Sequence, residues 1–155
     1  MVDYRRWYPR WRASGRFPEF VRRDALHEAA HAIIGEALGS PVVFVTLSGR
    51  QGSERSVPYT SSLYPGGPRR HERRAIVALA GHAADGRDWR HAEGCGDRAD
   101  ARKAAGYVIG SDLDHLWAVA RRLVKWNRPA IERLAAALLA EETIAGERVR
   151  VLMGG

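Results

Sequence analysis

Two histidines and a glutamate form the pattern with the clearest chemistry in this sequence. His27, Glu28 and His31 belong to the segment HEAAH, an HExxH motif. Residues four apart on a helix lie one turn above each other, so His27 and His31 can present two imidazole nitrogens to one ion. Zn²⁺ accepts two imidazoles and one carboxylate and leaves a position open for water. Glu28 lies at the edge of the same face, where it can deprotonate that water. The pattern indicates a zinc-dependent peptide hydrolase, provided that a third ligand exists.

A predicted helix holds the motif. Pro18 suits the first position of a helix, where its missing N–H costs nothing. Apolar residues then recur at helical spacing over 20–37, and Gly39 and Pro41 end the helix. The motif therefore lies in the second half of this helix, away from its fraying ends.

The rest of the chain predicts a mainly helical fold with a small β element, an α+β class. The 155 residues, 45% of them apolar, suffice for one domain, which we assign to 17–155 behind an N-terminal arm at 1–16. Residues 41–47 are β-branched and aromatic and predict a strand, 57–60 predict an edge segment, and 61–68 a loop. Further helices are predicted over 69–85, 100–109, 113–126, 130–142 and 145–153.

The third ligand is sought among the acidic, cysteine and histidine residues. Asp97 and Asp100 lie three apart at the start of one predicted helix, and chemistry alone does not separate a capping role from a ligand role. Cys95 fits either a thiolate ligand or a small buried residue. His82 is interpreted as a packed side chain rather than a ligand. Asp85 either accepts the second ring N–H of a ligating histidine or ends a helix as a surface carboxylate.

Three blocks of the sequence resemble the peptidase domain of the FtsH family of ATP-dependent zinc proteases. They are HEAAHAIIGEALG, ALAGHAAD and GDRADARKA, in the family's order, and a softer match follows in LAAALLAEETIAGERVRVLM. The resemblance implies a zincin-like helical domain with zinc on His27, His31 and Asp100 and with Glu28 as catalytic base. Aligning Gly96 with the family's glycine gives Asp100 the ligand position and leaves Asp97 as a cap. Substrate is then expected to lie extended along 42–47.

The sequence also departs from the family pattern. Ala30 stands between the histidines in place of the usual glycine, His82 in place of arginine and Asp85 in place of glutamate. No phosphate-binding loop of the GxxxxGK[ST] type is present. We therefore expect ATP-independent hydrolysis of peptides or unfolded protein segments. An unfoldase partner acting in trans is compatible with this expectation, and no oligomeric state is predicted.

The net charge of +7 is concentrated at the N-terminus. Residues 1–23 hold seven arginines against Asp3 and Glu19, a net charge of +5, which leaves +2 for the other 132 residues. Arginines interleaved with tyrosine and tryptophan in the arm suit a nucleic-acid backbone or an anionic membrane surface. We favour a third interpretation, in which the arm folds back on the domain. The second functional candidate is a zinc-containing binding or regulatory module that uses this arm, with little or no proteolysis.

The composition favours a cytoplasmic protein. Cys95 is the only cysteine, which excludes an internal disulfide. No apolar run reaches the length of a membrane span, because Glu36 interrupts the best candidate, and the first residues lack the apolar core of a signal peptide.

Overall fold

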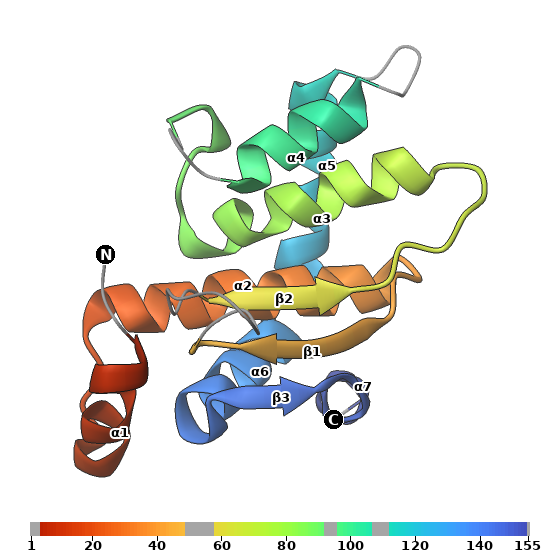
Figure 1. The fold of residues 1–155 in the computed structure, drawn as a ribbon. Helices are drawn as coiled ribbons and strands as arrows, with labels where there is room; N and C mark the ends of the chain where they lie inside the picture. Colours follow the sequence, from red (N-terminus) through yellow and green to blue (C-terminus); the bar gives the residue numbers. More distant parts are fainter. Residues whose placement is uncertain (1–3, 49–57, 92–95, 107–111, 155) are drawn as a thin grey trace.

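A computed structural model of the chain describes residues 4–48, 58–91, 96–106 and 112–154. These residues form a mainly helical fold with one small antiparallel sheet, as the sequence predicts (Figure 1). In order along the chain the elements are α1 (Tyr4–Ser14), α2 (Glu19–Ala37), β1 (Val42–Thr46), β2 (Tyr59–Ser62), α3 (Arg70–Asp85), the 3-10 turn η1 (Trp89–His91), α4 (Gly96–Ala105), α5 (Leu113–Trp126), α6 (Arg128–Glu141), β3 (Thr143–Ala145) and α7 (Gly146–Met153).

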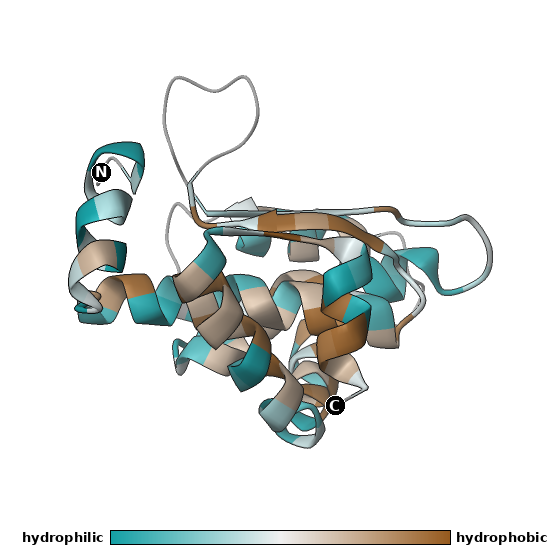
Figure 2. Cartoon of the chain, turned by 90° about the horizontal axis from the view of Figure 1, so that it is seen from below, coloured by the Kyte–Doolittle hydropathy of each residue, from teal (hydrophilic) through white to brown (hydrophobic). Residues whose placement is uncertain are grey.

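Helix α2 runs through the centre of the molecule. Every residue from His27 to Gly35 is buried, so this half of the helix is covered on all sides. Helix α3 packs along one side of α2, α6 along another, and β1 and β2 cover a third (Figure 1). Figure 2 shows the sheet as one layer above the helices. The predicted ends of α2 are confirmed within one or two residues.

The small sheet has the order β2-β1-β3, and both pairings are antiparallel. Val45 of β1 faces Thr60 on one side and Ile144 on the other. Because β1 is paired along both edges, the expectation that a substrate lies along 42–47 is wrong. Strand β2 lies at an edge of the sheet among the described strands, and it is the edge strand beside the predicted site. Strand β3 was not predicted from the sequence.

The N-terminal arm folds back on the domain as helix α1. Tyr4 and Tyr8 are four residues apart, so they share one face of the helix, and both are buried. The Tyr8 hydroxyl donates to the carbonyl oxygen of Leu139 at 2.8 Å, and the Tyr4 hydroxyl donates to the carboxylate of Asp24. The tyrosines thus anchor α1 against α6 and against the first half of α2.

The sheet is held against the end of α2 and the start of α7. The Glu36 carboxylate accepts from the backbone N–H of Val42 at 2.8 Å and from Arg150 of α7 at 2.7 Å. Gly146, the first residue of α7, lies so close to β1 that a Cβ atom there would stand 1.8 Å from the carbonyl oxygen of Val42. In the part of the chain that the structure describes, no helix is long and apolar enough to cross a membrane.

Gly146→Ala is expected to destabilise the fold by about 3 kcal/mol or more, because the new methyl group meets backbone atoms that cannot rotate away. Gly66→Ala is the matched control, since no described residue lies within 4 Å of a Cβ at Gly66. Urea unfolding of both variants measures the difference. Equal midpoints for the two variants would contradict the close approach of α7 to β1.

Candidate metal centre

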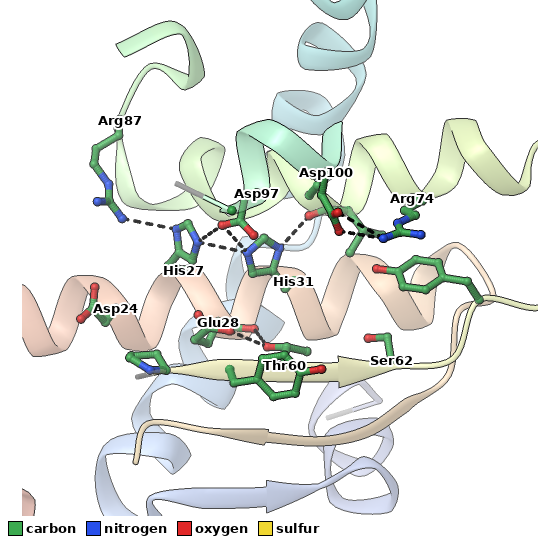
Figure 3. Close-up of a pocket in the computed structure, with 16 residues that line it drawn as sticks. Asp24, His27, Glu28, His31, Thr60, Ser62, Arg74, Arg87, Asp97 and Asp100 are labelled. Atoms are coloured by element: carbon green, nitrogen blue, oxygen red, sulfur yellow. Dashed lines mark hydrogen bonds and ion pairs between the residues drawn. The ribbon is translucent and has the colours of Figure 1, made fainter. Parts of the chain in front are cut away.

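His27 and His31 converge from neighbouring turns of α2. Their Nε2 atoms lie 3.0 Å apart, and both side chains are 7% exposed. The helical spacing of the HExxH motif therefore has the predicted effect, with two imidazole nitrogens directed at one point (Figure 3).

The third side chain at this point is Asp97, in the first turn of α4. Its Oδ2 atom lies 2.8 Å from Nε2 of His27 and 3.2 Å from Nε2 of His31. Asp100, which the sequence resemblance assigned to this place, is not in the cluster. Its two carboxylate oxygens each lie 3.1 Å from Nη2 of Arg74 on α3. The first turn of α4, with Asp97, lies next to the histidines of α2. Asp100 lies one turn further along α4, where its carboxylate pairs with Arg74 and not with the histidines (Figure 3).

The far side of each imidazole is held by α3. Nδ1 of His27 lies 2.8 Å from the carboxylate of Asp85, and Nδ1 of His31 lies 2.7 Å from the carbonyl oxygen of Val77. Both partners are acceptors, so each Nδ1 carries the proton. The contact predicted as one of two possible roles for Asp85 is therefore present. In its neutral form each imidazole then has its lone pair on Nε2, which is the form that binds a metal ion.

With both imidazoles neutral, three acceptors meet at one centre, namely two Nε2 lone pairs and a carboxylate oxygen of Asp97. Acceptors at 2.8–3.2 Å repel one another unless a cation lies between them. A tetrahedral Zn²⁺ at 2.0–2.1 Å from each ligand would place the ligand atoms roughly 3.3 Å apart. The donor set and the spacing therefore fit a zinc ion.

The electrostatics of the centre also favour a cation. Burial alone would lower the pKa of His27, but its hydrogen bonds to Asp85 and Asp97 outweigh burial and raise the pKa to about 10. His31 has a raised pKa for a related reason, since the Asp97 carboxylate outweighs the effect of its burial. Burial would raise the pKa of Asp97, but the two adjacent imidazoles hold it far below the usual range. A proton or a metal ion is needed to balance the negative charge at this cluster.

Glu28 lies beside this cluster on α2 and is also buried. Its Oε2 atom accepts a hydrogen bond of 2.7 Å from the hydroxyl of Thr60 on β2. Burial raises the pKa of Glu28, although the two histidines and the Thr60 hydroxyl oppose this effect. A cavity of about 560 Å³ opens here, lined by the cluster, by β2 and by the side chains of Asp24, Tyr64 and Arg87. The cavity exposes the three acceptors and Glu28 to a common space.

Two neighbouring residues on α3 were not assigned functional roles from the sequence. Gly81 faces His27, and a Cβ atom there would lie 2.5 Å from the ring. His82 is 1% exposed, and neither of its ring nitrogens has a hydrogen-bond partner among the described residues. His82, His27 and Asp85 form a second group close enough to hold an ion. The Asp85 carboxylate, however, already binds His27 and Arg87. The run of small residues Ala80, Gly81, Ala83 and Ala84 was the available signal that another helix approaches α3 closely here.

The three sequence blocks that resemble the FtsH peptidase lie on α2, α3 and α4, the helices that meet at this centre. No known protein-family model matches the chain, and no curated protein matches it either. The resemblance therefore rests on those blocks alone. Cys95, which was considered as a thiolate ligand, lies outside the described residues.

Gly81→Ala is expected to push the His27 ring off its position and to weaken zinc binding by about 10- to 100-fold, the range typical of lost support around a ligand. Competition against a chromophoric chelator measures the affinity. Gly106→Ala at the end of α4 is the control, because among the described residues a Cβ there meets only ordinary contacts at 3.5 Å. Unchanged affinity in the Gly81 variant would show that His27 does not need this close approach.

His82 predicts a specific pH dependence of stability. Burial lowers its pKa to about 4, so between pH 6.5 and 4 the unfolded chain binds a proton that the folded chain does not. Unfolding is therefore favoured as the pH falls through this window, by about 2–3 kcal/mol at pH 4.5. Urea unfolding of the wild type and His82→Phe at pH 7 and pH 4.5 isolates the effect. The wild type should lose more stability than the variant, and equal losses would contradict a neutral buried His82.

Proposed function

We propose that this protein is a zinc-dependent metalloendopeptidase that hydrolyses peptide bonds in peptides or unfolded protein segments without ATP. The observation that carries the proposal is the convergence of His27, His31 and Asp97 on one point beside the buried carboxylate of Glu28. In this proposal the two imidazoles and the Asp97 carboxylate hold Zn²⁺. When bound, the ion polarises the scissile carbonyl and lowers the pKa of a water molecule toward neutrality.

Glu28 is proposed as the group that moves the proton. Its carboxylate accepts a proton from the attacking water and delivers it to the leaving amine. The raised pKa of Glu28 suits this role, because a carboxylate that ionises only reluctantly takes up a proton readily. Thr60 holds one carboxylate oxygen and so orients the other toward the reacting atoms.

Strand β2 is the proposed docking edge for the substrate. Pro58, Tyr59, Thr60 and Ser62 line the cavity that contains the cluster, and β2 lies at one end of the strand order. An extended peptide can add to such an edge through main-chain hydrogen bonds. Only an extended chain can pair in this way, which supports peptides, unfolded segments and flexible termini as the substrate class.

The test combines zinc content with cleavage. We expect one zinc per chain in the wild type and in Asp100→Asn, and a loss of zinc in Asp97→Asn, as measured by plasma mass spectrometry. Asp100→Asn is the matched control, because it removes the same charge three residues away. Loss of zinc in the Asp100 variant, with retention in the Asp97 variant, would reject the assigned ligand set.

Glu28→Gln should retain zinc and cleave an unfolded fluorescent casein about 10²- to 10⁴-fold more slowly than the wild type, because it lacks the general base. A wild type that holds zinc and cleaves no unfolded substrate would instead favour the binding-module function.

A further inference from the structure

The outer face of α1 takes no part in the proposed peptidase site. Tyr4 and Tyr8 use one face of the helix to anchor it, and the arginines of this segment are exposed on the remaining surface. They are Arg5, Arg6, Arg10 and Arg12, with Arg16 just beyond the helix. Helix α1 contains no acidic residue. Four guanidinium groups thus lie along a helix of 11 residues, about 16 Å long, and a fifth lies just past its end.

These arginines are not neutralised within the part of the domain that the structure describes. None of the five forms an ion pair with a described residue, whereas other arginines such as Arg74, Arg87 and Arg128 do. Arg6 and Arg10 lie four residues apart on the same side of α1. Their guanidinium carbons stand 5.6 and 5.3 Å from the ring centre of Trp7, which is itself 37% exposed. Stacking on Trp7 keeps both cations at the surface in a defined place.

A hollow of about 590 Å³ adjoins this basic face. Arg12 and Arg22 line it together with Phe17, Leu139 and the small residues of α6. A ligand that fits both parts carries regularly spaced negative charges and flat apolar groups. Single-stranded nucleic acid has this chemistry, because its phosphates bind arginine and its unstacked bases pack on aromatic and apolar surfaces.

We propose that α1, together with this hollow, is a binding surface for single-stranded nucleic acid. Arg6 and Arg10 on one side of α1, and Arg12 and Arg22 at the hollow, each contact a phosphate, and the hollow beside Phe17 takes an unstacked base. A membrane fits less well, since an interfacial helix needs an apolar face for the lipid. The tyrosine face of α1 is already buried against the domain. The proposal does not depend on the proposed peptidase activity.

The test measures binding of the full-length protein to fluorescent 20-nucleotide oligo(U) RNA and oligo(dT) DNA by anisotropy. With about four phosphates contacted, a rise in salt from 50 to 200 mM should weaken binding roughly 50-fold. The double variants Arg6→Gln/Arg10→Gln and Arg12→Gln/Arg22→Gln should each weaken binding about tenfold or more at 100 mM salt. Both should keep the zinc content and unfolding midpoint of the wild type.

Arg121→Gln/Arg122→Gln is the matched control, because it removes two exposed arginines from α5 and should change binding little. A control that weakens binding as much as the α1 variants would show diffuse attraction and overturn the proposal. So would tighter binding to a 20-base-pair duplex than to the single strands, since a duplex offers no unstacked base. Binding to phosphatidylserine vesicles or polyglutamate, with no binding to either oligonucleotide, would also overturn it.

Discussion

The hydrogen bonds on the outer side of the two imidazoles govern the geometry of the whole centre. Asp85 and the carbonyl of Val77 both belong to α3, and they fix the ring orientation and the proton position of two histidines that belong to α2. Without them, neither Nε2 lone pair would have a set direction. The close packing of α3 against α2 is therefore a requirement of the site, and Gly81 shows how little space that packing leaves.

The part of the site that lies on one helix could be predicted from the sequence, because helical spacing alone brings His27 and His31 together. The third residue of the cluster, Asp97, could not be predicted in this way. Asp97 and Asp100 differ by three residues on α4, and the choice depends on how α4 approaches α2 and on the contact between Asp100 and Arg74. These are long-range contacts. An alignment to a single glycine does not contain them.

The sheet and the arm show the same limit of prediction from the sequence. Strand β3 has three residues, too few for an alternating pattern, yet its pairing makes β1 the central strand and leaves β2 at the edge. The edge proposed for substrate docking thus depends on residues about a hundred positions after β1. In the arm, the abundance of arginine obscures the four-residue spacing of Tyr4 and Tyr8, which holds α1 as a docked helix. The tyrosine contact with Asp24 also places this basic helix beside the cavity of the centre.

The span of chain between the proposed ligands has a thermodynamic consequence. Asp97 follows His31 by 66 residues, so an ion shared by α2 and α4 would act as a cross-link that closes a long loop. A covalent cross-link over such a loop stabilises a fold by about 4 kcal/mol through the lost freedom of the unfolded chain. By analogy, a chelator would act on this protein as a reductant acts on a disulfide. It would release α4 first, while the two histidines on α2 kept their places one turn apart.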